Sequence, residues 1–94
     1  MRLRLSRAAL RDLTEAVTYI AADNIDAAER LRGRLLVAAD QLRRFPGLGP
    51  AETSGRRVFT VTGTRFRLIY QAGPAEIVIL RILHGARQWP PARD

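Results

Sequence analysis

The sequence contains no cysteine and no lysine, and its only histidine and only tryptophan lie near the C-terminal end. Without cysteine, disulfide bonds and thiolate metal sites are excluded, and a single histidine gives no basis for a histidine metal site. Without lysine, there is no phosphate-binding loop of the Gly-Lys-Ser/Thr kind. The two serines, Ser6 and Ser54, have no nucleophile motif around them. We therefore expect neither a metal nor a cofactor.

Long apolar runs are missing as well. No stretch approaches the roughly 20 apolar residues of a membrane-spanning helix. Residues 2–5 alternate arginine with leucine and do not form the apolar core of a signal peptide. Together with the lack of cysteine, this leads us to expect a cytoplasmic protein that does not associate with a membrane.

The cationic side chains are all arginines, 16 in number, and they give the chain a net charge of +7. Guanidinium groups bind carboxylates and phosphates through paired hydrogen bonds and never lose their charge. A small basic domain is expected to meet an acidic partner, either nucleic acid or an acidic protein segment. Codon bias in a GC-rich genome would also favour arginine over lysine, and charge alone does not choose between the two partners.

The length suits one domain, residues 1–94, that buries a single modest core. Residues 3–5 alternate in polarity, as a short strand does, and Ser6 is a suitable N-cap for a following helix. Spacings of three and four residues predict the buried face of that helix, which is formed by Leu10, Leu13, Val17 and Ile20.

A second helix is predicted to start near Asp26 and to end at Phe45, with Asp26 and Glu29 at the spacing of a capping box. Its apolar seam steps by four and three through Leu31, Leu35, Ala38, Leu42 and Phe45. Pro46 and Gly47 end it, and the short connection makes the two helices an antiparallel hairpin. The acidic residues of this hairpin are expected on solvated surfaces and caps: Asp12, Glu15, Asp23, Asp26, Glu29 and Asp40.

Three strands are predicted after a loop at residues 46–55. They span residues 57–62, 65–71 and 76–83, joined by turns at Gly63-Thr64 and Gly73-Pro74 into an antiparallel meander. The third is apolar at nearly every position, which is typical of a central strand. The prediction is a two-layer α+β fold, with an N-terminal helical hairpin packed on a small antiparallel sheet, in the order strand, helix, helix, strand, strand, strand. We expect a site on the open face of the sheet or at the end of the third strand.

Arg65 and Arg67 project from the same face of their predicted strand, whereas Phe66, Leu68 and Tyr70 project from the core face. The two arginines form either a cationic binding patch or an ordinary solvated face. Counting back from the turn places Arg81 beside Phe66, or beside Arg67 if one residue bulges.

Arg81 interrupts the apolar run at residues 77–83 and needs either a partner or access to solvent. It could face an acidic partner or a phosphate, or it could be structural and paired with Glu76, Glu52 or a backbone carbonyl. His84 ends the strand, where an imidazole can transfer protons near neutral pH or simply hydrogen-bond the backbone. Trp89 could anchor a partner or fold back onto the core.

The segment from Phe66 to Pro90 resembles the ParE branch of the RelE/ParE toxin superfamily. The resemblance rests on the strand Phe66-Arg67-Leu68-Ile69-Tyr70 and on the ending with Arg81, His84-Gly85 and Arg87. The pattern over residues 6–13 and the long helix ending at Phe45-Pro46-Gly47 are also similar to the family. The resemblance covers nearly the whole chain, although its front half is generic.

The resemblance implies a RelE/ParE-like fold and a toxin of a type II toxin–antitoxin system, of the kind linked to plasmid stabilization. Its partner would be a ParD-like antitoxin in a hetero-oligomer, and its target would be DNA gyrase, through the A subunit, blocked without catalysis. No membrane contact and no direct sequence-specific binding of nucleic acid is implied. The residues expected to bind antitoxin or target are Arg65, Arg67, Arg81, His84, Arg87 and Trp89.

RelE-type relatives share this fold but cut messenger RNA on the ribosome, which is the alternative. Cleavage needs cations around the scissile phosphate and a group that transfers protons. Here Arg65, Arg67 and Arg81 would bind the phosphate and His84 would transfer the proton. The chain departs from that pattern because it has no lysine and no tyrosine after His84. The prediction is therefore a gyrase inhibitor rather than an enzyme.

Overall fold

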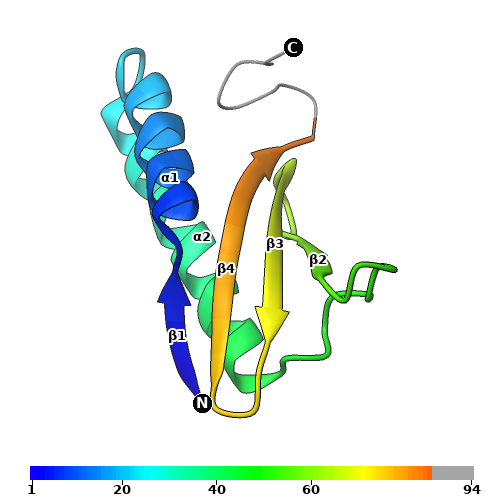
Figure 1. Ribbon diagram of the computed structural model, residues 1–94. Coiled ribbons are helices and arrows are strands. Elements are labelled where there is room, and N and C mark those ends of the chain that lie inside the picture. Colours follow the sequence, from blue (N-terminus) through cyan, green and yellow to red (C-terminus); the bar gives the residue numbers. More distant parts are fainter. Residues whose placement is uncertain (86–94) are drawn as a thin grey trace.

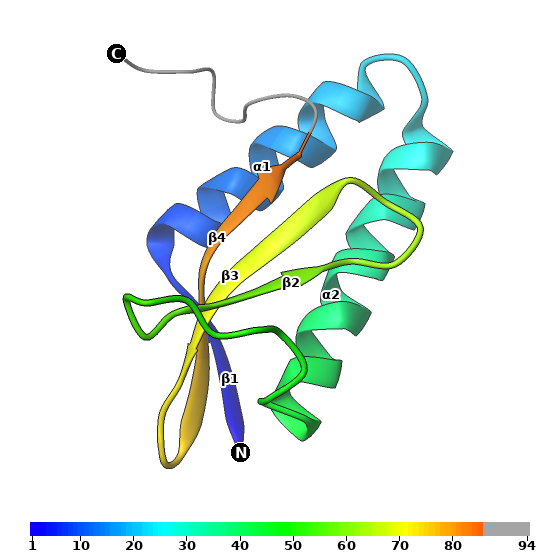
Figure 2. The ribbon, with the colours of Figure 1, turned by 90° about the vertical axis from the view of Figure 1, so that its right-hand side faces the viewer.

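The computed structural model describes residues 1–85 and shows two helices covering one face of a four-stranded sheet (Figure 1). The elements in chain order are β1 (Arg2–Leu5), α1 (Arg7–Ala21), α2 (Ile25–Arg44), β2 (Arg57–Thr60), β3 (Phe66–Ala72) and β4 (Glu76–His84). The predicted α+β class, element order and helical hairpin are confirmed. Figure 2 looks onto the opposite face of the sheet, which carries no helix.

The sheet has the strand order β1-β4-β3-β2. The last three strands form the predicted antiparallel meander, and β4 lies inside the sheet, as its apolar sequence indicates. The sheet is nevertheless mixed, because β1 pairs in parallel with β4, from Arg2 opposite Glu76 to Leu5 opposite Ile79. The helical hairpin and the β2–β3 hairpin lie between β1 and β4 in the chain and together form the long connection that parallel neighbours require.

Each helix begins at a residue whose side chain accepts a hydrogen bond from the first turn. Ser6 Oγ accepts from the Ala9 amide at 3.0 Å, which confirms Ser6 as the N-cap of α1. α2 begins at Ile25, close to the predicted start near Asp26, but its N-cap is Asn24, whose Oδ1 accepts from the Ala27 amide at 2.9 Å, so the predicted capping box of Asp26 and Glu29 is wrong. Both caps satisfy amides that the helix itself leaves unpaired.

The helices bury different kinds of side chain against the sheet. The apolar seam of α2 is confirmed up to Leu42, but Phe45 is 58% exposed because the backbone leaves the helix there. The prediction for α1 is wrong at Leu10, which is 50% exposed. Its buried residues are Ala9, Asp12 and Ala16, and the small alanines let α1 approach β4 closely.

Phe66, Leu68 and Tyr70 of β3 are buried, as predicted for the core face. The Tyr70 hydroxyl accepts from the buried Gly49 amide at 2.9 Å and donates to the Pro46 carbonyl at 2.7 Å. One core side chain thus fixes the loop that follows α2. Within residues 1–85, neither helix is both long and apolar enough to cross a bilayer.

Candidate functional site

The predicted site residues that the structure describes gather at the end of the sheet where β3 begins and β4 ends. Arg65 is exposed and precedes β3, and its carbonyl accepts from the Gly85 amide at 2.6 Å. Arg67 is exposed on β3, between Thr60 of β2 and Leu83 of β4. Arg87 and Trp89 lie outside the described residues.

Both predicted positions of Arg81 are wrong, because Arg81 lies opposite Ile69. The turn occupies residues 73–76 and is closed by a hydrogen bond from the Gly73 amide to the Glu76 carbonyl at 2.8 Å, so pairing begins at Ala72 opposite Ile77. An irregularity between Ile69 and Tyr70 shifts the register by one further residue. A bulge of this kind changes the direction in which the following side chains project, and here it moves Arg81 by one position along its partner strand β3.

Arg81 is bound by Asp12 of α1 through a paired interaction. Its Nε donates to Asp12 Oδ2 at 2.7 Å and its Nη2 donates to Asp12 Oδ1 at 2.9 Å. Asp12 is only 2% exposed, so the expectation that it lies on a solvated surface is wrong. Placing a charged guanidinium in an apolar strand costs free energy unless it has a partner, and Asp12 is that partner. The predicted partners Glu76 and Glu52 are not used. Glu76 instead pairs with Arg4 at 3.3 Å.

Asp12 also hydrogen-bonds the backbone of β4 where no neighbouring strand does so. β1 pairs with β4 only as far as Ile79, and beyond that point α1 runs beside the strand. Ser6 Oγ donates to the Leu80 carbonyl at 2.9 Å, and Asp12 Oδ2 accepts from the Ile82 amide at 2.9 Å. The N-cap and the second turn of α1 therefore satisfy backbone groups of β4 that lie beyond the end of β1.

The hydrogen bonds that Arg81 donates to Asp12 raise the pKa of the Arg81 guanidinium above its already high usual value, and the nearby charge of Glu15 acts in the same direction. A raised pKa means that the arginine's contribution to stability is fully present below its ordinary pKa and is lost only in stronger alkali. Arg81 therefore remains charged and paired at any physiological pH. Since its side chain is only 37% exposed and Asp12 takes two of its nitrogens, it is poorly placed to bind a further anion.

His84 is half-buried, and its ring meets the Phe66 ring edge-on, with centroids 4.9 Å apart and planes at 87°. This arrangement is a favourable geometry for aromatic packing. It places the imidazole at the end of β4, as predicted, but against the core residue Phe66. Among the described residues, no three acidic or histidine side chains come close enough together to hold a metal ion.

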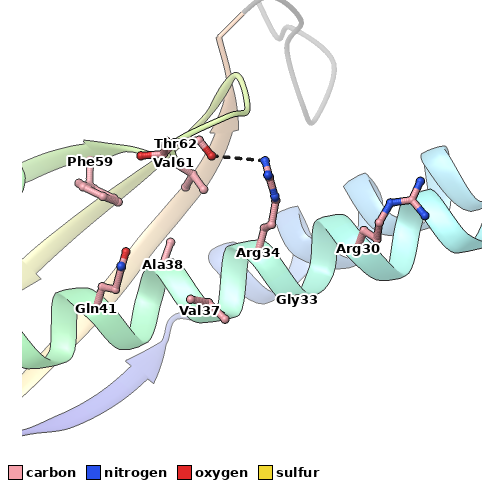
Figure 3. Close-up of a pocket in the computed structure, with 9 residues that line it drawn as sticks. All are labelled: Arg30, Gly33, Arg34, Val37, Ala38, Gln41, Phe59, Val61 and Thr62. Atoms are coloured by element: carbon pink, nitrogen blue, oxygen red, sulfur yellow. Dashed lines mark hydrogen bonds between the residues drawn. The ribbon is translucent and has the colours of Figure 1, made fainter.

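The sequence did not predict a second surface, a groove of about 580 Å³ between α2 and the β2–β3 hairpin. Figure 3 shows its lining residues as sticks: Arg30, Gly33, Arg34, Val37, Ala38, Gln41, Phe59, Val61 and Thr62. We call it the α2–β2 groove. Arg34 Nη1 donates to the carbonyls of Thr62 at 3.4 Å and Gly63 at 3.2 Å, which ties the hairpin turn to the helix. The only sequence signal for this groove is the glycine within the helical pattern.

Comparison with known proteins gives three consistent findings. The family model described as the ParE toxin of the type II toxin–antitoxin system parDE matches residues 3–89. A Sinorhizobium fredii (strain NBRC 101917 / NGR234) protein named "Putative toxin Y4kP" is 32% identical over 90 residues, which cover 95% of this chain and 93% of that protein. A chain from the solved chromosomal ParDE TA system from P. aeruginosa is 26% identical, with a TM-score of 0.76, and the match covers 89% of this chain and 95% of that chain.

Proposed function

The chain belongs to the ParE toxin family of type II toxin–antitoxin systems, and we propose that it arrests growth by binding DNA gyrase without catalysing a reaction. The proposal that the chain catalyses no reaction is supported mainly by the pairing of Arg81 with buried Asp12. An RNA-cleaving site needs cations free to stabilise charge on a phosphate. The residue best placed at the end of β4 for that task already has an internal partner.

The remaining site residues favour binding over chemistry. His84 packs edge-on against Phe66, and proton transfer would require its ring to reach a substrate atom within hydrogen-bond distance. Arg65 and Arg67 are exposed at the helix-free face and the adjoining end of the sheet. Exposed guanidinium groups on a rigid sheet suit an acidic surface on a larger protein.

We further propose that a ParD-like antitoxin neutralises the toxin by covering it with a segment rich in carboxylates and apolar side chains. The net charge of +7 supports an acidic partner, and the likeness to a chain of a ParDE system supports a partner of this class. A segment that folds on binding loses conformational entropy but can cover a large surface.

Two assays on the same purified chain test this function. We expect the chain to inhibit supercoiling by DNA gyrase, and a prior incubation with excess antitoxin to abolish the inhibition. In a reconstituted translation reaction with labelled messenger RNA, we expect the message to remain intact. Ribosome-dependent cleavage of the message with gyrase unaffected would replace this proposal with the RelE-like one.

A further inference from the structure

In the described part of the chain, one face of the sheet carries no helix (Figure 2). Leu3 and Leu5 of β1 pack against the core, as do alternate residues of β3, so the residues between them project from the helix-free face. Residues paired across neighbouring strands share a face, which extends this assignment to β2 and β4. The strand pairing therefore defines which side chains this face presents to another molecule.

The charges on the helix-free face are mainly positive. Arg2 and Arg4 of β1 and Arg67 of β3 are exposed there. Among the strand residues of this face, Glu76 is the only acid, and it is already paired with Arg4 at 3.3 Å. The side chains of Arg2 and Arg67 have no hydrogen-bond or ion-pair partner within residues 1–85. The face therefore has unused guanidinium donors, and these complement an acidic partner.

Apolar side chains lie between these arginines. They are half-buried, because neighbouring strands shield their flanks but no described helix covers them: Val58, Ile69, Val78 and Leu83. Val58 lies opposite Ile69, and Leu83 lies opposite Arg67. An apolar centre with a charged rim is the usual arrangement of a protein–protein interface.

A hollow of about 340 Å³ opens on the same face. Arg4, Gln71 and Val78 line it from three strands, and Gly55 of the loop before β2 lines it as well. A projecting side chain of a partner fits into such a hollow, as the residues that dominate binding energy often do. Because the lining combines a guanidinium with an apolar side chain, it suits an acidic side chain with an aliphatic stem.

The aromatic side chains of the sheet distinguish a protein partner from a nucleic acid. Sheets that bind single-stranded nucleic acid stack bases on exposed aromatic rings. Here Phe66 and Tyr70 are buried, and Phe59 packs against the core. His84 lies edge-on to Phe66 on the same side. No aromatic ring of the described strands thus projects from the helix-free face, which favours an acidic protein surface over a nucleic acid.

We propose that the helix-free face binds the target, and that the target contributes an acidic protein surface with an apolar centre. This inference rests on the proposed inhibition of gyrase and adds the location and the chemistry of the contact. Acidic side chains of the gyrase A subunit pair with Arg2, Arg4 and Arg67, and its apolar side chains cover Ile69 and Val78. The N-terminal strand β1 then takes part in binding as well as in folding.

Removing charge from β1 tests this surface. The double variant with Arg2→Gln and Arg4→Gln loses two charges but keeps polar side chains, and we expect its affinity for purified gyrase A subunit to fall about tenfold at low salt. Potency in the supercoiling assay should fall in parallel. The matched control combines Arg32→Gln with Arg44→Gln on α2, where one exposed arginine has no partner and the other pairs with Asp40 at 3.7 Å. We expect the control to bind gyrase with nearly wild-type affinity.

Ile69→Thr tests the apolar centre independently. Threonine keeps the β-branched shape that suits a strand, so we expect the melting temperature to fall by only a few degrees. The affinity for gyrase should fall several-fold, because apolar contact area is lost. Leu10→Thr is the control, since Leu10 is 50% exposed but lies on α1.

Wild-type affinity for gyrase in both the β1 double variant and the folded Ile69→Thr protein would overturn the inference and leave the proposed function standing. Weaker binding to the antitoxin, to a labelled DNA duplex or to a second copy, with gyrase binding unchanged, would also overturn it. If the wild-type chain neither binds nor inhibits gyrase, the proposed function itself fails and the inference fails with it.

Discussion

Asp12 and Arg81, 69 residues apart in sequence, join the first helix to the last strand through two hydrogen bonds of 2.7 and 2.9 Å. The carboxylate is buried, and the same oxygen that binds Arg81 Nε also accepts from the Ile82 amide. A paired guanidinium and carboxylate is among the stronger polar interactions in proteins. Arg81 therefore stabilises the last part of β4, and we propose that the exposed residues Arg65 and Arg67 provide the binding surface.

Removing Asp12 should destabilise the toxin strongly. Asp12→Ala leaves a guanidinium and the Ile82 amide without their acceptor, and we expect a loss of about 2–4 kcal/mol, less than for a fully buried pair because Arg81 reaches solvent. Asp12→Asn should lose less, since its amide oxygen can still accept from Ile82. Urea denaturation measures both. If the losses of unfolding free energy caused by Asp12→Ala and by Arg81→Ala simply add in the double variant, the two residues are not coupled.

Arg81→Glu should abolish toxicity and antitoxin binding by disrupting the fold. The new carboxylate would lie beside Asp12, with Glu15 also nearby, and like charges in a partly buried site repel strongly. Circular dichroism should therefore show loss of cooperative unfolding. A well-folded Arg81→Glu variant with wild-type affinity in a calorimetric titration would contradict this account.

Arg67→Glu should instead keep the fold and weaken binding. Arg67 is exposed on β3, and its opposite neighbours across the sheet are Thr60 and Leu83. We expect the melting temperature to change little and the affinity for an acidic partner to fall by about tenfold at low salt, with a smaller effect at high salt. Arg56→Glu is the matched control, because it makes the same change of two charges at an exposed residue outside the strands of the sheet. Equal effects of the two substitutions would argue against a specific role for Arg67.

His84→Phe should leave growth arrest intact. Phenylalanine keeps the edge-on ring contact with Phe66 but cannot transfer a proton. His84→Ala should also arrest growth, although it loses about 0.5–1.5 kcal/mol of stability with the ring contact. Plating assays under induced expression measure toxicity. Loss of toxicity in the folded His84→Phe protein would favour the ribonuclease alternative.

Tyr70→Phe should loosen the loop after α2. The substitution removes the acceptor for the buried Gly49 amide and the donor to the Pro46 carbonyl, and we expect a cost of about 1–3 kcal/mol. Hydrogen exchange at the Gly49 amide should accelerate while exchange in β4 stays slow. Unchanged exchange at Gly49 would show that another group holds the loop.

The pattern of apolar residues was sufficient to predict the layers of the fold. The meander, the central position of β4 and the core face of β3 all follow from period-two alternation and turn residues, which are local properties. The same reasoning failed at Leu10 and Phe45, which are exposed. Helical periodicity identifies an apolar stripe, but the orientation of a helix on its sheet also depends on the side chains and polar groups of the strands it packs against. Here the small alanines and Asp12 of α1 lie against β4.

The sequence by itself determined the class of fold, the cationic character of the chain and its likeness to a toxin family, because these depend on composition, periodicity and short motifs. Only the tertiary structure decided what Arg81 does, since its partner lies on a different element and its register depends on a four-residue turn and a one-residue shift. The α2–β2 groove also required the fold, because its lining comes from two segments that packing brings together. Interactions between distant residues follow from geometry that no local pattern encodes.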